Sequence, residues 1–146
     1  MLRDKTSHPH FIKGGQHIDK RGKVSFVNDF LMDSCHRFYQ ITHDNTKFVR
    51  AWQGHKIESK WFYCIKGGFE VKLIKPDCWE MPSRIIESYN FEIHQKITEV
   101  LYIPPGYLNG FRAIEPDSSF IIFSDKDISS SKADDYRFDK KLLEVW

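Results

Sequence analysis

The sequence predicts an all-β fold of the sandwich, jelly-roll or small-barrel kind, formed by a single domain over residues 1–146. Short apolar or alternating runs recur about every ten residues along most of the chain. The breaks between them carry turn residues, such as Pro-Pro-Gly at 104–106 and Glu-Pro-Asp at 115–117. No segment before residue 125 shows a convincing helical apolar repeat. Many short strands at even spacing are typical of these all-β architectures.

The expected strands can be placed one by one along the chain. Between two of them, Lys66-Gly67-Gly68 predicts a tight hairpin turn in which the glycines supply positive φ. The tail after residue 128 is polar, with room for one helical turn. The predicted strands cover residues 25–30, 37–42, 60–65, 69–74, 84–87, 91–94, 100–103, 111–114 and 120–123.

Composition excludes several classes of protein. The 22 Lys and Arg residues are interleaved with 20 Asp and Glu, so there is no basic stripe of the kind nucleic-acid binders show. No run approaches the roughly 20 apolar residues of a membrane span, and the polar opening segment does not resemble a signal peptide. Cys35, Cys64 and Cys78 form no CxxC pair, which favours a reducing compartment and incidental thiols. We therefore expect a cytoplasmic protein with no nucleic-acid or membrane partner.

The densest group of polar residues is Arg-Ala-Trp-Gln-Gly-His-Lys at 50–56, followed by Lys60. If this segment is extended, Trp52 shares a face with Arg50, and Gln53 shares the other face with His55. A lysine that begins an apolar strand is costly unless the interior there is wet or anionic. Two plainer readings remain open: His55 is a hydrogen-bonded surface or core histidine, and Lys60 extends to solvent from a strand end.

A second group lies at 101–111, Leu-Tyr-Ile-Pro-Pro-Gly-Tyr-Leu-Asn-Gly-Phe. On its own this segment predicts only a loop between two strands, because Pro-Pro-Gly and Asn-Gly are both turn sequences. Tyr107 and Asn109 are its candidate binding residues.

Together these segments resemble the cupin superfamily, and within it the RmlC-like dTDP-4-keto-6-deoxyglucose 3,5-epimerases and the dTDP-sugar 3,4-ketoisomerases (WxcM-like). The epimerases read K-L-V-x-V-x-x-G and V-P-x-G-F-A-H-G-F, similar to KWFYCIKG at 60–67 and IPPGYLNGF at 103–111. The ketoisomerases read R-G-x-H-A-H-K, similar to RAWQGHK at 50–56. Asp-Lys-Arg-Gly at 19–22 is similar to a D-x-R-G whose arginine contacts the nucleotide diphosphate. The resemblance runs from about residue 16 to residue 138.

The resemblance implies a double-stranded β-helix, the cupin jelly roll, and a homodimer whose subunits pair through their sheets. It also implies removal of a proton next to the ketone of a nucleotide sugar, with a cation to hold the enolate charge. His55 is then the expected base and Lys60 the expected enolate stabiliser. Trp52, Trp61 or Tyr107 are candidates for stacking on a base or sugar, although plain core packing is the alternative for each. The expected substrate-binding residues are Arg21, Arg50, Gln53, Trp52, Tyr107 and Asn109, with Arg21 and Arg50 on the diphosphate.

The chain departs from the family pattern at important positions. Gln53 stands where the epimerases carry their general base, and glutamine cannot take up a proton at neutral pH. Asn109 replaces the histidine of the H-G-F motif, and no tyrosine follows directly after Phe123. The ligand positions of metal-binding cupins hold Gln53, His55, Ser59 or Lys60 in place of the carboxylate, and Asn109, and one imidazole beside a cation is not a transition-metal site. We therefore expect no metal and no other cofactor.

Three classes of function remain open. The first is an isomerase of deoxysugar or polysaccharide biosynthesis, either a 3,5-epimerase acting on a dTDP-4-keto-6-deoxyhexose or a 3,4-ketoisomerase. Lys60 and residues 103–111 favour the epimerase, whereas the His55-Lys56 pair favours the ketoisomerase. The second class is a non-catalytic sugar- or nucleotide-binding cupin, which Gln53 and Asn109 favour. The third is a metal cupin or a structural β-domain.

Overall fold

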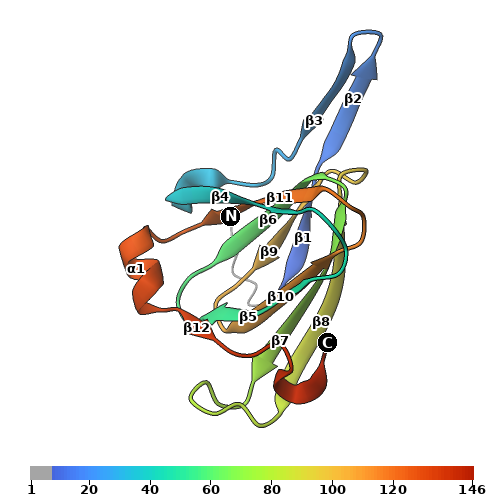
Figure 1. Ribbon diagram of the computed structural model, residues 1–146. Helices are drawn as coiled ribbons and strands as arrows, with labels where there is room; N and C mark the ends of the chain where they lie inside the picture. Colours follow the sequence, from blue (N-terminus) through green and yellow to red (C-terminus); the bar gives the residue numbers. More distant parts are fainter. Residues whose placement is uncertain (1–7) are drawn as a thin grey trace.

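The computed structural model describes residues 8–146, and the polar opening segment lies outside this range. Two five-stranded antiparallel sheets face each other and confirm the predicted jelly roll (Figure 1). The first has the order β1 (His10–Lys13), β9 (Glu99–Ile103), β6 (Lys60–Lys66), β11 (Ser118–Ser124) and β4 (Arg37–His43). The second has the order β12 (Tyr136–Arg137), β5 (Val49–His55), β10 (Tyr107–Ala113), β7 (Gly68–Pro76) and β8 (Ile85–His94).

The remaining elements are a separate hairpin and three short helices. Strands β2 (Gly15–Asp19) and β3 (Gly22–Phe26) pair only with each other in the described chain. The helix α1 (Ile128–Ala133) starts at Asp127, whose side chain accepts a hydrogen bond from the Ser130 amide, and lies where a helical turn was expected. The other two are 3₁₀ turns at Met32–Ser34 and Leu142–Glu144. None of the helices within residues 8–146 is long and apolar enough to cross a membrane.

The predicted hairpin around Gly67 is wrong, although both of its strands are present. β6 pairs with β9 and β11, whereas β7 pairs with β8 and β10, so the turn carries the chain from one sheet to the other. Of the two glycines in this turn, Gly67 has positive φ (65°), whereas Gly68 already belongs to β7. A tight glycine turn fits a corner between sheets as well as a hairpin, and the pairing is decided by long-range contacts.

Three other boundaries differ from the prediction. Residues 84–87 and 91–94 belong to one continuous strand, β8, because β7 supplies hydrogen-bonding partners through the intervening polar residues. The expected strand at 25–30 ends at Phe26, where β3 finishes. β10 starts at Tyr107, four residues before the strand predicted from Phe111, so the expected loop is largely strand.

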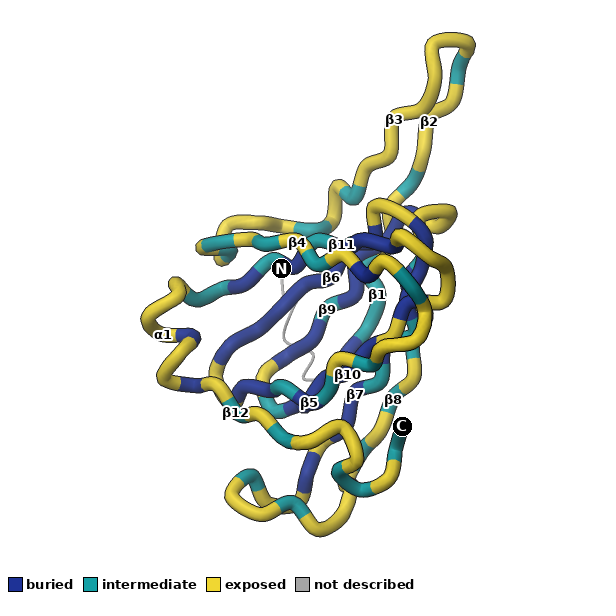
Figure 2. Tube along the Cα trace, in the orientation of Figure 1, coloured by how far each residue is buried: buried dark blue, intermediate teal, exposed yellow. Residues whose placement is uncertain are grey.

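The main core lies between the two sheets and is built from alternate residues of each strand. Its largest fully buried side chains include Phe62, Phe69, Leu101 and Phe120. A second cluster, formed by Trp52, Ile74 and Leu108 with residues of the C-terminal segment, lies on the outer face of β5, β10 and β7. Figure 2 shows buried strands through the centre and a C-terminal segment in which exposed and half-buried residues are mixed.

The β2–β3 hairpin, residues 15–26, forms an arm that stands away from both sheets (Figures 1 and 2). Every residue of β3 is exposed. The apolar side chains of Ile18 and Val24 are 69% and 61% exposed. A lone two-stranded hairpin is marginally stable in water. Unlike the strands of the two sheets, β2 and β3 therefore lack the packing against a core that stabilises the rest of the fold.

Candidate functional site

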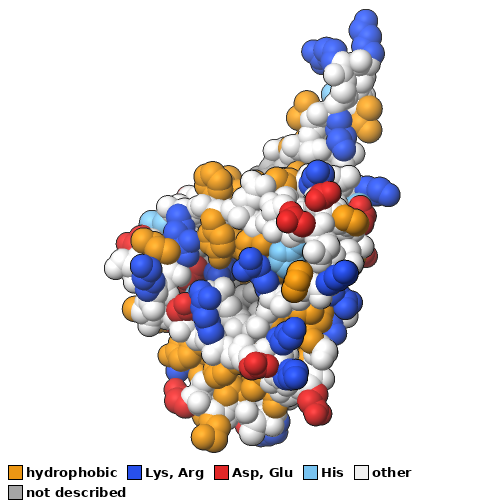
Figure 3. All heavy atoms as spheres, in the orientation of Figure 1, with side chains coloured by type: hydrophobic (Ala, Val, Ile, Leu, Met, Phe, Trp, Pro, Cys, Tyr) orange, Lys and Arg blue, Asp and Glu red, His pale blue; other side chains and the backbone are white. Residues whose placement is uncertain are grey.

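A cavity of about 830 Å³ lies at one end of the jelly roll, between the two sheets and the segment that contains α1. Figure 3 shows basic side chains gathered around a hollow on this face of the molecule. Since only one acidic side chain within residues 8–146 lines the cavity, its charge suits an anionic ligand. Its charged lining residues are Arg37, Arg50, Lys60, Lys132, Arg137 and Asp135.

The first sheet contributes Arg37, Tyr39 and Lys60 to the cavity. Ser124 of β11 pairs with Arg37 on one side and Lys60 on the other, so the three share one row of the sheet. Lys60 is only 3% exposed, and its Nζ donates to Tyr39 Oη over 3.0 Å. The lysine therefore does not extend to solvent. It presents a buried ammonium group beside a phenol.

The second sheet contributes Arg50, Gln53 and Asn109. Gln53 stands opposite Asn109, and Arg50 stands opposite Phe111, so the two residues 51–52 of β5 face Gly110 alone. This register shift breaks the strict alternation that the sequence analysis assumed. Arg50 and Gln53 both line the cavity, whereas the ring of Trp52 packs in the second cluster. The expectation that Arg50 and Trp52 share one face of the strand is therefore wrong.

Arg50 also contacts the buried histidine of β4. Its Nε donates to His43 Nε2 over 3.1 Å, which fixes the neutral form of that ring with its proton on Nδ1. Burial, and then the charge of Arg50, lower the pKa of His43. The arginine, which lines the cavity, is thus anchored through its Nε.

Residues 128–138 form the third wall of the cavity. Asp135 Oδ1 accepts hydrogen bonds from Gln53 Nε2 at 3.1 Å and from Arg137 Nε. Burial raises the pKa of Asp135, but these two bonds outweigh it and hold that pKa below its usual value. Arg37 Nη2 donates to Ser131 Oγ over 3.0 Å, which ties the wall to the first sheet.

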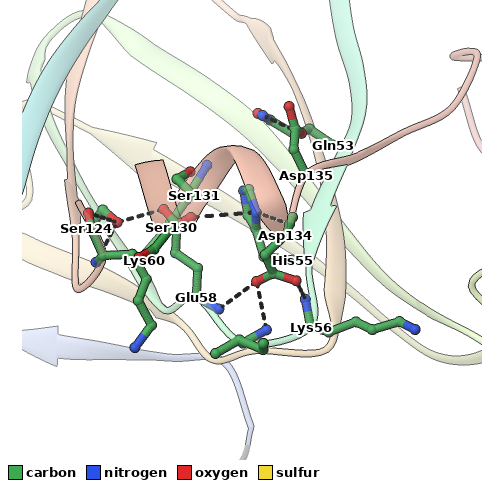
Figure 4. Close-up of polar contacts among 12 residues, drawn as sticks. Gln53, His55, Lys56, Glu58, Lys60, Ser124, Ser130, Ser131, Asp134 and Asp135 are labelled. Carbon is green, nitrogen blue, oxygen red and sulfur yellow. Dashed lines mark hydrogen bonds and ion pairs between the residues drawn. The ribbon is translucent and has the colours of Figure 1, made fainter. Parts of the chain in front are cut away.

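His55 lies beside the cavity but is not among its lining residues. The ring is 3% exposed, and Nδ1 is 2.6 Å from the carbonyl oxygen of Asp134. Burial, and then the charge of Lys60, lower the pKa of His55, so the ring is neutral at pH 7. Its Nε2 has no hydrogen-bond partner within residues 8–146. Figure 4 shows His55 with Asp134 and Glu58, separate from the Gln53–Asp135 pair.

The structure does not bring three other expected residues into one site. Tyr107 packs in the main core, and its hydroxyl donates to Glu87 over 2.7 Å; burial and this bond raise the pKa of Tyr107. Trp52 touches the cavity wall, but its ring packs in the second cluster with Trp146, which is the plain packing alternative. Arg21 lies at the end of the arm, its side chain 83% exposed and paired with Asp19.

Solved structures with the same architecture include dTDP-sugar enzymes. QdtA, a sugar 3,4-ketoisomerase from Thermoanaerobacterium thermosaccharolyticum in complex with TDP, is 19% identical, with a TM-score of 0.72 over 94% of this chain and 90% of that one. A dTDP-4-dehydrorhamnose 3,5-epimerase from Bacillus anthracis, with TDP and PPi bound, is 14% identical, with a TM-score of 0.74 over 94% and 84%. The chain has the RmlC-like cupin fold. No protein-family model and no curated sequence matches it.

The resemblance described from the motifs is thereby confirmed for the fold of this cupin. The positions that the sequence analysis matched to the ligands of metal-binding cupins carry one imidazole among amide and ammonium groups: Gln53 and His55 on β5, Lys60 on β6 and Asn109 on β10. Residues 8–146 contain no group of three or more His, Cys, Asp and Glu side chains placed to hold a metal ion. Amide and ammonium groups do not make a transition-metal site.

Sequence reasoning missed several residues of this cupin's cavity. Tyr39 and Arg37 alternate within a correctly predicted strand, so their shared face could have been found once Lys60 was suspected. Asp135 gave no such signal, because it lies in a polar tail whose path no local pattern predicts. Glu58 belongs to none of the motifs that the sequence analysis singled out, yet its side chain is fully buried.

Proposed function

We propose that this cupin is a sugar-nucleotide isomerase that acts on a dTDP-4-keto-6-deoxyhexose by proton abstraction next to the ketone. The observation that carries the proposal is the basic cavity with a buried lysine at its edge. A nucleotide sugar offers a diphosphate for the arginines and a carbonyl for the lysine. That enzymes of this fold have been solved with TDP bound supports the same ligand class here.

Lys60 is the proposed enolate stabiliser. When a C–H bond next to the ketone breaks, its electron pair moves into the enolate and negative charge grows on the oxygen. A fixed ammonium group in a water-poor site stabilises that charge strongly. Tyr39, hydrogen-bonded to Lys60 at 3.0 Å, supplies a hydroxyl in the same place that can donate to the same oxygen.

Arg50 is the proposed contact to the diphosphate, since a planar guanidinium binds phosphate oxygens through two parallel bonds. Gln53 and Asn109 face each other on β5 and β10 and offer amide groups for sugar hydroxyls. These assignments keep the polar residues of the cavity in binding roles and leave the proton transfer to another group.

His55 is the proposed base. Because its Nδ1 donates to the Asp134 carbonyl, Nε2 carries the lone pair that can accept the substrate proton. That atom is buried, so this role requires a small movement of the groups around it to admit the sugar. For keto transfer, His55 then returns the accepted proton to the neighbouring carbon of the enolate. For epimerisation, the enolate takes a proton from an acid on the opposite face of the ring, and His55 later gives up its own proton to solvent.

Two alternatives rest on specific observations. The first alternative is the 3,4-ketoisomerase. The pairing of Gln53 with Asp135 leaves no base at the usual epimerase position, and His55 followed by Lys56 resembles the ketoisomerase motif, which favours 3,4-keto transfer.

The second alternative is a binding protein without turnover. It is favoured because the lining of the cavity contains no imidazole among the described residues.

We also propose that the protein is a homodimer in which the arm contacts a second copy. Ile18 and Val24 remain exposed on the arm, and a partner surface would cover them. The same contact would give Arg21 a position near a bound nucleotide that its own chain does not provide.

The deciding experiment is hydrogen exchange in D₂O with dTDP-4-keto-6-deoxyglucose, followed by NMR at C3 and C5. Exchange at both positions supports the epimerase, and exchange at C3 with formation of a 3-keto product supports the ketoisomerase. Binding of the nucleotide sugar without any exchange would overturn the enzyme proposal in favour of the binding protein.

A further inference from the structure

A buried carboxylate lies behind His55 and takes no part in the roles described so far. Glu58 follows β5 and is three residues from His55, and its side chain has no exposure to solvent. Glu58 Oε1 is 3.5 Å from His55 Nδ1 and has no hydrogen-bond partner of its own within residues 8–146. An unsatisfied buried carboxylate oxygen is costly, so its place beside an imidazole calls for an explanation.

The other oxygen of Glu58 is held firmly in place. Oε2 accepts a hydrogen bond from Ser124 Oγ and lies 3.5 Å from Arg37 Nη2. Arg37 in turn reaches Ser131 of α1, so the carboxylate is fixed between the first sheet and the third cavity wall. With Oε2 anchored in this way, Oε1 is left directed at the ring.

The backbone around Glu58 is ordered by a neighbouring acid. The carboxylate of Asp134 accepts the amide hydrogens of Lys56, Ile57 and Glu58. The same residue accepts the His55 Nδ1 hydrogen through its carbonyl oxygen. Asp134 therefore fixes both the loop that carries Glu58 and the orientation of the imidazole.

We propose that Glu58 is a positioning residue for His55, which favours the tautomer with hydrogen on Nδ1 and stabilises the imidazolium formed when Nε2 takes a proton. The reason is charge: a carboxylate beside Nδ1 favours a hydrogen on that nitrogen and a positive ring. The effect of Glu58 on catalysis rests on the proposed function, whereas its effect on the tautomer and charge of the His55 ring is independent of that function.

Several charged groups face His55 and act in opposite directions. Lys60 disfavours the charged ring, whereas Glu58, Asp134 and its neighbour Asp135 favour it. Arg37 partly neutralises Glu58 from the far side, and Tyr107 is the cross-strand neighbour of His55. Among these, only Glu58 combines full burial with a carboxylate oxygen that has no other partner.

The test is an NMR titration of the histidine side chains in the whole ¹⁵N-labelled protein, between about pH 5 and 8, where histidine titrates. His55→Asn identifies the signal by its loss. In the wild type we expect hydrogen on Nδ1 at neutral pH. In Glu58→Gln we expect the pKa of His55 to fall by about one unit or more, the usual effect of removing a carboxylate at this range, and the tautomer preference to weaken.

Two further variants make the result decisive. Glu80→Gln removes an exposed carboxylate that contacts Lys56, and it should leave the His55 signal unchanged. Ser124→Ala releases the anchor of Glu58 without changing charge, and it should shift the His55 titration in the same direction by a smaller amount. If Glu58→Gln does not fold, the wild-type tautomer and Ser124→Ala decide the matter. A wild-type ring with hydrogen on Nε2, or a His55 titration unchanged by these substitutions, would overturn the proposal.

Activity provides a separate readout. In Glu58→Gln the rate constant for exchange should fall with little change in KM, and the acid limb of the pH profile should move to lower pH with the pKa of His55. A wild-type protein without exchange would defeat the proposed function, and the NMR titration would still decide the role of Glu58.

Discussion

The cavity and the β2–β3 arm present the same kind of charge in opposite surroundings. At the cavity, the ammonium group of Lys60 is buried and hydrogen-bonded, and Arg50 is anchored on His43. On the arm, Arg21 extends into water and pairs with Asp19, two residues away. The sequence motifs predict that Arg21 and Arg50 both contact the diphosphate. Within a single chain, however, only Arg50 of the two lines the cavity.

This difference shows that a motif gains chemical meaning from its surroundings. A charge in a site sheltered from water acts on a ligand with little screening, whereas an exposed ion pair is screened by solvent and salt and contributes little. Arg21 becomes a ligand contact only if a second molecule shelters it. The described residues that line the cavity, by contrast, already shelter the Lys60 ammonium group within one chain.

The largest expected effect is at the buried cation. Lys60→Met keeps the length of the side chain and removes its charge, and we expect the exchange rate to fall about a hundredfold or more. Affinity for the nucleotide sugar should change much less, because the enolate charge develops mainly in the transition state. The measurement is exchange in D₂O together with calorimetry.

The matched control is Lys20→Met, the same change on the exposed arm, which should leave the rate of exchange nearly unaltered. Equal losses in the two variants, or full activity in Lys60→Met, would contradict the assignment of Lys60.

The next effect is at the two arginines. Arg50→Lys keeps the charge but loses the planar pair of donors, so affinity for dTDP should fall about tenfold, or about 1.4 kcal/mol. Arg21→Lys sharpens the comparison between cavity and arm. A similar loss of dTDP affinity in Arg21→Lys would mean that the arm reaches the cavity of a second copy. No loss of affinity would mean that the cavity binds dTDP without the arm. Unchanged affinity in Arg50→Lys would refute its role.

Much of the fold was predictable because local patterns were sufficient for it. The alternation at 69–74 and the apolar run at 60–65 predicted β7 and β6, which the structure confirms. The pairing of strands was not predictable in the same way: Gly67 was read as a hairpin and instead turns the chain between sheets. Local sequence specifies a turn, whereas strand partners depend on contacts far along the chain.

The candidate site was predictable only in part, for a related reason. Lys60 was identified because a charged residue in an apolar strand needs an explanation, and the structure buries it at the cavity. Trp52 and Arg50 were expected to share one face of the strand, because the register shift opposite Gly110 cannot be predicted from alternation. Asp135 and Glu58 were missed because the long-range contacts that give them their positions leave no trace in nearby sequence.

The third prediction tests whether the arm needs a partner. Ile18→Asp places a charge on its exposed apolar face, and we expect a dimeric wild type to lose half its mass in light scattering at micromolar concentration. Lys20→Ser, on the same arm but polar from the start, should leave the mass unchanged. A wild-type protein that is already monomeric would refute the dimer and leave Arg21 without a ligand role.

The smallest expected effect is the pH dependence of stability, which again separates the cavity from the arm. Burial lowers the pKa values of His43 and His55 in the folded protein, so below the usual histidine pKa of 6.5 the unfolded chain binds more protons than the folded one. The free energy of unfolding should therefore fall as the pH drops from about 7 through 6.5 and level off below the folded pKa values. The loss is larger the further burial lowers the pKa of each histidine in the folded protein below that of the unfolded chain. Urea denaturation across this range should show a smaller loss in His43→Gln, which can still accept the bond from Arg50. His17→Gln, on the arm, should follow the wild type, and a His43→Gln curve parallel to the wild type would show that His43 takes no part in the dependence.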